Sequence, residues 1–476
     1  MKTITMGSAT AWSRDRFEPA MDLLTQGNVK YLCFDAMSEV TMSAAQVAHM
    51  EDKSIPAYDP YLARRMRPIL RECKKRGAKI ITNSGWLDPV GAAKLILSIG
   101  EELGMKDLTV AAVGGGILTD RIADMNLKFT ETGEPISAYR DKIVSAEAYL
   151  GARGIVEGLR QGADVVVTTR VADACLFLGP MIYEFGWDME DADQMAAGMI
   201  LGHLVECGAQ VCGGYFADPG FKNVPRLAEL GNPILEVRED GGQMSAFIRK
   251  VPGSGGLLSS STCKEQLLYE VQDPNAYYCP DVVADLTKVR FKDVEKDVVQ
   301  VLIDHAGKPK TDTLKALVGM KEGFMTEEMI LFAGPGAMER AKATEDLLRE
   351  RFAKVKLVAD EIRMDYVGLN AVHRESSPEP QSPPYEAVLR VTVKTKTRQE
   401  ADKLRVEVDP LAVNGVYGTG KWATSAPGSR VRPVIGLYST LVPKSAIDVD
   451  VLMLSMSAST FKSTGAARES ALAARA

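Results

Sequence analysis

The chain has 476 residues, of which 46% are hydrophobic and 25% are charged, a composition ordinary for a soluble globular protein. This length predicts more than one domain, or one large α/β domain with an appendage. The formal net charge of −6 gives no electrostatic attraction to nucleic acid or to anionic membranes, so neither is expected as a partner.

Membrane and export signals are absent from the sequence. No apolar run approaches the roughly 20 residues that a membrane span needs, and the first residues lack the apolar core of a signal peptide. The seven cysteines show no CxxC spacing, and their odd number argues against a disulfide framework or a zinc cluster. We therefore expect a reduced, cytoplasmic protein.

The first part of the chain alternates short apolar runs with amphipathic segments. Strands are expected from Thr3 and over 29–35, 78–83 and 108–113, with helices over 16–25, 41–50, 58–76 and 90–103. This alternation predicts an α/β fold with a mostly parallel, helix-covered sheet.

The middle of the chain continues this pattern, and its character changes after about residue 310. We expect a helix over 148–160, a buried strand over 165–169, helices within 178–202, a hairpin over 234–250, a helix over 263–271, and strands over 281–289 and 298–302. Beyond 310, strands are expected over 327–332, 356–366 and 387–395, with helices ending near 352 and 406; the tail, 463–476, is expected to be frayed or weakly helical. The predicted domains are an α/β domain over 1–310, which carries the functional site, and a smaller α+β region over 311–476.

Polar residues recur where the predicted strands end. Ser8, Asp35 and Asn83 follow three successive strands, and Arg170 and Asp173 follow the buried strand over 165–169. Because parallel sheets place their chemistry at the carboxyl ends of strands, these residues are predicted to share one cleft. The alternative for Ser8, Asp35 and Asn83 is an ordinary role in caps and turns.

Several stretches resemble the acyclic terpene utilisation AtuA-like family. They are Ala163-Asp-Val-Val-Val-Thr-Thr-Arg-Val-Ala-Asp173, residues 202–220, Pro252-Gly-Ser-Gly-Gly256, residues 265–270 with Asp273-Pro274, residues 280–285, and Ala333-Gly-Pro-Gly336. The resemblance runs from about Gly7 to Val416. It implies a role in bacterial catabolism of terpenoids and other branched acids through acyl-CoA intermediates.

The resemblance also raises the question of a partner. Some relatives carry, or pair with, a small ferredoxin-like C-terminal domain, whose glycine- and aspartate-rich opening is not seen in this sequence. The family pattern therefore implies a separate ferredoxin-like partner subunit, or none. Relatives usually show Asn-Ala-Gly-Gly where this chain reads Asn83-Ser-Gly-Trp86, so a different substrate is expected.

Four residues are candidates for catalysis. Asp173 could act as a base, and His203 with Glu206, spaced i, i+3 on one helix face, could form a metal pair or a base with its orienter. The alternative is a buried histidine that is satisfied by its helix neighbour. Cys207 is a candidate nucleophile, although buried cysteines are usually inert packing. The candidate metal is Mg²⁺, held by carboxylates among Asp35, Glu39, Asp173 and Glu206.

Substrate binding is predicted from a charged group and from flexible backbone. Arg170 could clamp a carboxylate or phosphate, or form an internal ion pair with Asp173. The glycine pairs could present backbone donors to an anion, or could form plain turns. The predicted binding residues are Ser8, Asp35, Asn83, Arg170, Gln210, Gly213, Gly214, Gly255 and Gly256.

We therefore predict an enzyme that acts on a small carboxylic acid or acyl-CoA by proton transfer, as a hydratase or dehydratase, a lyase or an isomerase. The alternative is a non-catalytic substrate-binding or scaffold subunit that works with a small ferredoxin-like partner. A nicotinamide oxidoreductase is not favoured because no dinucleotide fingerprint is present. No organic cofactor is indicated, and a homo-oligomer is expected.

Overall fold

A computed structural model describes residues 1–378, 380, 382–421 and 431–456. The chain forms two compact units, the first built from Met1–Val318 with the segment that begins at Leu437, the second from Gly319–Gly436. Both units contain helices and strands, which confirms the predicted α/β fold class. The predicted tail at 463–476 lies outside the described residues.

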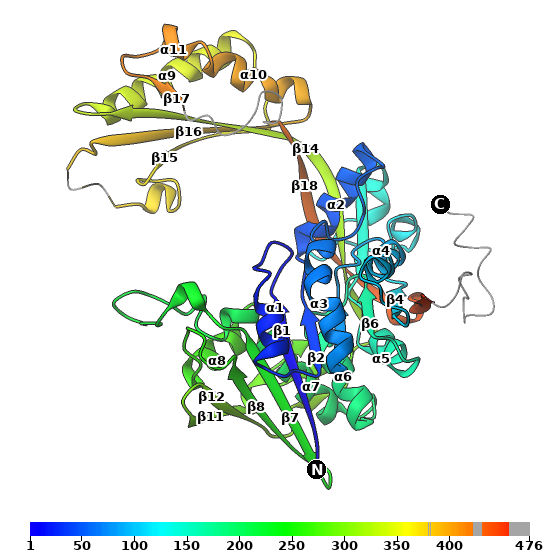
Figure 1. Cartoon of the computed structure of the whole chain (residues 1–476). Helices are drawn as coiled ribbons and strands as arrows, with labels where there is room; N and C mark the ends of the chain where they lie inside the picture. Colours follow the sequence, from blue (N-terminus) through cyan, green and yellow to red (C-terminus); the bar gives the residue numbers. More distant parts are fainter. Residues whose placement is uncertain (379, 381, 422–430, 457–476) are drawn as a thin grey trace. The chain divides into compact units, whose positions relative to one another are not determined.

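The first unit is built on a ten-stranded mixed sheet (Figure 1). Its parallel centre, in spatial order, consists of β1 (Lys2–Thr10), β2 (Tyr31–Phe34), β3 (Lys79–Thr82), β6 (Val165–Thr168) and β4 (Thr109–Gly114). The antiparallel strands β7 (Pro233–Asp240), β8 (Gln243–Lys250), β12 (Val298–Ile303) and β11 (Val289–Glu295) extend it beyond β1, and β19 (Asp450–Ser455) extends it beyond β4.

Helices cover both faces of the parallel centre. On one face α1 (Pro19–Thr25), α3 (Leu62–Arg76) and α4 (Pro89–Glu102) bury a continuous apolar core against the strands (Figure 1). On the other face lie α5 (Arg153–Arg160), α6 (Cys175–Phe185) and α7 (Ala192–Glu206), which contact β4, β2 and β1 respectively. Each fully buried leucine, isoleucine or valine in such a core contributes roughly 1.5–3 kcal/mol.

The strand order reverses at β6, which inserts between β3 and β4. In an open α/β sheet, such a reversal leaves a crevice at the carboxyl ends of the neighbouring strands, and ligands bind there. Asp35, Asn83 and Arg170 follow β2, β3 and β6, so the topology places all three at this edge.

The remaining elements of the first unit include two differences from the predicted ones. The predicted helix over 148–160 begins only at Arg153, because Ile143–Ala148 form strand β5. The predicted strand over 281–289 is wrong: only Val283–Ala284 (β10) pair, and a 3-10 turn over Leu286–Lys288 follows. The other elements are α2 (Glu39–Glu51), α8 (Ser260–Leu268), β9 (Tyr277–Tyr278), β13 (Gly307–Lys308) and the 3-10 turns Ile122–Asp124, Ile136–Lys142, Gly208–Gln210, Leu227–Glu229 and Lys444–Ala446.

The second unit has a βαββαβ order. Its elements are β14 (Thr313–Ala333), which begins in the first unit, α9 (Ala337–Lys354), β15 (Glu361–Val367), a 3-10 turn (Arg374–Ser376), β16 (Glu386–Thr395), α10 (Arg398–Val408), α11 (Leu411–Asn414) and β17 (Gly420–Lys421). The antiparallel sheet order β17-β14-β16-β15 is that of the ferredoxin-like fold, a name that describes topology alone. Strand β18 (Arg432–Pro443) also pairs with β14.

Within the part of the chain that the structure describes, no helix is both long enough and apolar enough to cross a membrane.

Candidate functional site

Asp35 and Asn83 meet at the carboxyl ends of β2 and β3. Asn83 donates its side-chain Nδ2 to Asp35 Oδ1 at 2.7 Å, and its Oδ1 accepts the backbone N–H of Ala36 at 2.7 Å. Both side chains are buried, at 6% and 0% exposure. Burial raises the pKa of Asp35, and the negative charge of Asp173 raises it further. The predicted meeting of these two strand ends is therefore seen in the structure.

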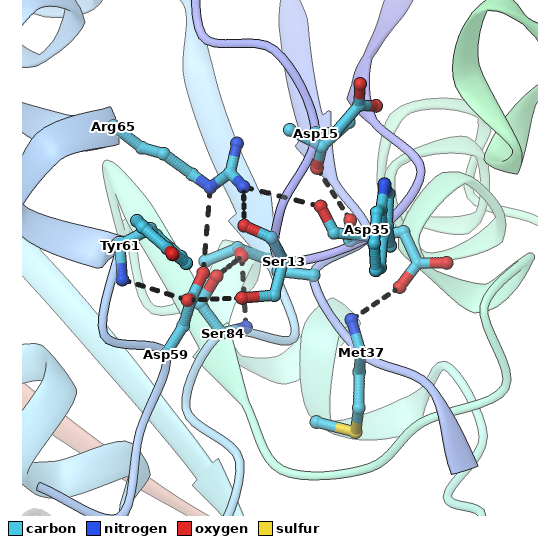
Figure 2. A network of polar contacts seen from close by, with 12 residues as sticks. Ser13, Asp15, Asp35, Met37, Asp59, Tyr61, Arg65 and Ser84 are labelled. Atoms are coloured by element: carbon cyan, nitrogen blue, oxygen red, sulfur yellow. Dashed lines mark hydrogen bonds and ion pairs between the residues drawn. The ribbon is translucent and has the colours of Figure 1, made fainter. Parts of the chain in front are cut away.

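A buried ion pair holds the adjoining loops in place (Figure 2). Asp59 accepts hydrogen bonds from Ser13 Oγ at 2.8 Å and from the backbone N–H of Tyr61 at 3.0 Å, and its own N–H donates to the carbonyl of Ser84. Arg65 Nε lies 3.6 Å from Asp59 Oδ2, and Arg65 donates to the carbonyl of Ser13. The loops after β1 and β3 are thus joined through Asp59 and Arg65.

Arg170 and Asp173 form the charged centre of this edge. Arg170 is 3% exposed, and its Nη2 lies 3.3 Å from Asp173 Oδ2 and 3.7 Å from Glu39 Oε1. Its guanidinium lies over the ring of Tyr149, 4.2 Å from the ring centre. Nε and Nη1 of Arg170 are buried and have no hydrogen-bond partner in the structure. The ion pair with Asp173 therefore exists, and it leaves two guanidinium nitrogens unused.

Asp173 is poised to exchange a proton near neutral pH. Burial raises its pKa and the positive charge of Arg170 opposes this, but the negative charges of Glu206 and Glu39 add to the rise, and the pKa reaches about 7. Its Oδ1 has no hydrogen-bond partner. A carboxyl group in this state can accept or donate a proton without a large energetic cost.

His203 and Glu206, at the end of α7, form a closed pair. His203 Nδ1 lies 2.8 Å from Glu206 Oε1, and Nε2 lies 3.2 Å from the carbonyl oxygen of Leu267. Both ring nitrogens face oxygen atoms, an arrangement that favours the protonated imidazole. Burial lowers the pKa of His203, but the Glu206 carboxylate outweighs it and the net pKa is raised. His203 thus orients Glu206 and has no free nitrogen for a substrate.

Two other predicted residues lie beside this pair. Ser8 was expected after its strand but lies within β1, and its Oγ donates to the backbone carbonyl of Glu206 at 3.3 Å, which ties β1 to the end of α7. Burial raises the pKa of the Cys207 thiol, and the Glu206 charge raises it further. A thiol that keeps its proton is a poor nucleophile.

The predicted glycines form a loop-to-loop contact. The N–H groups of Gly213 and Gly214 donate to the carbonyls of Gln210 and Ala209, and those of Gly255 and Gly256 donate to Glu229 and Pro225. A Cβ added at Gly255 would lie 2.1 Å from the carbonyl oxygen of Arg226, which explains the residue type. All four amides are engaged within the protein, so none is free to bind an anion. Gln210 lies on the same loop, with a partly exposed side chain.

In the described residues, no group of three or more His, Cys, Asp or Glu side chains is arranged to hold a metal ion. Asp35, Asp173 and Glu206 influence one another electrostatically without such an arrangement. Mg²⁺ at these carboxylates stays a prediction.

Two residues of the site, Glu147 and Tyr149, were missed in the sequence. Glu147, on β5, is 3% exposed, and its Oε1 has no hydrogen-bond partner. Burial raises its pKa to about 8 against the opposing effects of Ser145 and Arg170. The alternation of Val144, Ala146 and Ala148 with polar neighbours was the available signal for a strand with a polar face.

The fold and the site together define a two-unit α/β protein with an arginine–carboxyl centre at the reversal point of a parallel sheet. Residues 4–453 match the family described as acyclic terpene utilisation family protein AtuA. The protein belongs to this family, which confirms the resemblance seen in its sequence. No curated protein matches the chain.

Proposed function

We propose that the protein is an enzyme of acyclic terpene or related branched-acid breakdown, which transfers a proton on a small carboxylic acid or its CoA thioester. The observation that carries this proposal is the buried Arg170, with two unpartnered nitrogens, beside a carboxyl group whose pKa is about 7. An arginine with free donors binds a carboxylate or another anionic group of the substrate. The neighbouring carboxyl group then accepts the substrate's proton or donates one to it.

In this proposal the substrate anion lies against Nε and Nη1 of Arg170. Asp173, as the carboxylate, takes a proton from the carbon next to the substrate carbonyl group. In a dehydration the C–H electrons form a C=C bond as the neighbouring C–OH bond breaks, and the protonated Asp173 returns its proton to the leaving oxygen, which departs as water. In an isomerisation the substrate already holds a C=C bond, which shifts by one position as Asp173 returns the proton to another carbon. Family membership supports the substrate class, and the geometry of Arg170 and Asp173 supports the reaction type.

The buried polar contacts around Asp173 support its role. His203 holds Glu206, and Asn83 holds Asp35, so both neighbouring carboxyl groups keep fixed positions beside Asp173. Burial raises the pKa of Asp173 most, and the negative charge of Glu206 adds to the rise against the opposing charge of Arg170, so the pKa of Asp173 is about 7.

The test is exchange of substrate C–H for solvent deuterium, because exchange reports proton transfer even when the full reaction is not completed. A panel of branched carboxylic acids and their CoA thioesters is incubated with the protein in D2O and followed by NMR and mass spectrometry. We expect exchange or a mass change of one water for at least one member, reduced about 10²–10⁴-fold in Asp173→Asn. The exposed Asp120→Asn is the control. Equal exchange in wild type and Asp173→Asn would contradict the proposal.

A further inference from the structure

The surroundings of Arg170 are incomplete for a buried cation. Its guanidinium has ion-pair contacts of 3.3 Å and 3.7 Å through Nη2 alone, and Nε and Nη1 are buried without partners. A buried group of this kind needs hydrogen-bond acceptors, which a bound ligand can supply.

One carboxylate of the chain already lies beside this guanidinium, at its third nitrogen, Nη2. Glu39 Oε1 accepts a hydrogen bond from the Tyr149 hydroxyl at 2.8 Å and lies 3.7 Å from Arg170 Nη2. The side chain of Glu39 is 51% exposed, whereas that of Arg170 is 4% exposed. Glu39 is therefore the contact of Arg170 that solvent can most readily replace.

The other components of this place are fixed. Two cations contact the ring of Tyr149, with the Arg170 guanidinium 4.2 Å and the Lys315 ammonium 5.1 Å from its centre. Its backbone N–H donates to the carbonyl of Lys315 at 2.9 Å. Tyr149 is thus a hydroxyl donor held in position beside the guanidinium, and both donors suit one carboxylate.

Glu39 can leave this place without movement of its helix. It is the first residue of α2, and the next turn is held by a 2.7 Å hydrogen bond between the hydroxyls of Ser43 and Ser145. Met42 packs against Met37 and Trp86 in a separate apolar cluster. A rotation of the exposed Glu39 side chain toward solvent would free Arg170 Nη2 and the Tyr149 hydroxyl from Glu39.

The contacts that Glu39 makes define the ligand group. Asp173 already pairs with Arg170 Nη2 at 3.3 Å, and Glu39 adds one further carboxylate at 3.7 Å, so the place that Glu39 fills matches one carboxylate group. We infer that Arg170 and Tyr149 form a subsite for a single carboxylate group, and that Glu39 fills it as an internal stand-in until a carboxylate ligand takes its place. This inference rests on the proposed function in one respect, which is that the substrate anion binds at Arg170.

Calorimetric titration with butanoate tests this inference, with inorganic phosphate, tetrahedral and doubly charged at the mildly alkaline pH used for both ligands, as the comparison. Glu39→Gln and Glu39→Ala remove the competing carboxylate and are expected to bind butanoate about tenfold more tightly than wild type. Glu51→Gln, at the exposed far end of α2, is the matched control and should bind as wild type does. Adding Tyr149→Phe to Glu39→Gln should reverse most of the gain.

Three results would overturn the inference. They are equal butanoate affinity in Glu39→Gln, Glu39→Ala and Glu51→Gln, an equal gain for phosphate, and no binding of butanoate to any variant. Because butanoate binding needs no turnover, the test is independent of the proposed reaction. Absence of deuterium exchange would refute the proton-transfer proposal and leave the affinity gain of Glu39→Gln untouched.

Discussion

Replacement of Glu147 by glutamine tests the electrostatics of the site through protein stability. Glu147 is buried on β5, and its pKa is about 8 in the folded protein, against an ordinary value of 4.5. The direction in which the free energy of unfolding changes with pH follows from proton binding. Between these two values the folded state keeps a proton that the unfolded state has lost, so stability falls as pH rises from 4.5 toward 8.

The magnitude can be worked from these values. Each pH unit in this window costs about 1.4 kcal/mol, so Glu147 destabilises the folded protein by roughly 3 kcal/mol at pH 7 relative to pH 4.5. Glutamine has nearly the same shape and does not titrate. The Glu147→Gln variant should therefore lose this pH dependence. Its free energy of unfolding minus that of wild type should rise by roughly 3 kcal/mol between pH 4.5 and pH 7.

Urea denaturation at several pH values, followed by tryptophan fluorescence, measures this difference. Three of the four tryptophans, Trp12, Trp86 and Trp187, belong to the first unit, and Trp422→Phe in every protein compared makes the signal report the unit that contains Glu147. Glu157→Gln, an exposed residue on α5, is the control and should run parallel to wild type. Parallel curves for Glu147→Gln as well would show that Glu147 ionises normally in the folded protein, and the reasoning would be refuted.

Three further predictions follow from the site. If Asp173 acts as the carboxylate, kcat/KM should rise with pH through about 7, and a flat profile from pH 5 to 9 would exclude that role. Substituting alanine for His203 leaves the Glu206 carboxylate buried without its partner, so we expect a loss of about 3–5 kcal/mol in urea denaturation; a change below about 1 kcal/mol would mean that the pair is neutral. Trp86 has a φ of 44°, a strain of roughly 1–3 kcal/mol, but it is 7% exposed and donates Nε1 to the Ala36 carbonyl. Loss of a buried tryptophan costs about 3–5 kcal/mol, so Trp86→Gly should lower stability, and a more stable variant would show that strain dominates.

The strand-end part of the site could be predicted from the sequence. Asp35, Asn83 and Arg170 each follow a short apolar run, and the parallel-sheet rule alone brings them to one edge. The ion pair of Arg170 with Asp173 was also open to prediction, because the two residues are three apart after one strand.

Other features depend on tertiary partners that spacing does not reveal. Gly213 and Gly255 read equally well as anion-binding backbone or as turns, and only the carbonyls that face their amides decide between the two. The pairing of β14 with both β16 and β17 gives the second unit its ferredoxin-like order, and strand order does not follow from local periodicity. The sequence did not reveal the role of Glu147. A helix was expected from residue 148, whereas a strand, β5, ends at Ala148 and the helix starts only at Arg153.

The most direct test of the proposed site is a crystal structure of the protein with a bound carboxylate substrate or with butanoate. The account predicts that the ligand carboxylate lies against the Arg170 guanidinium and the Tyr149 hydroxyl, with Glu39 turned to solvent and Asp173 beside the ligand's second carbon. A ligand bound elsewhere in the first unit, with Glu39 still on Tyr149, would contradict it.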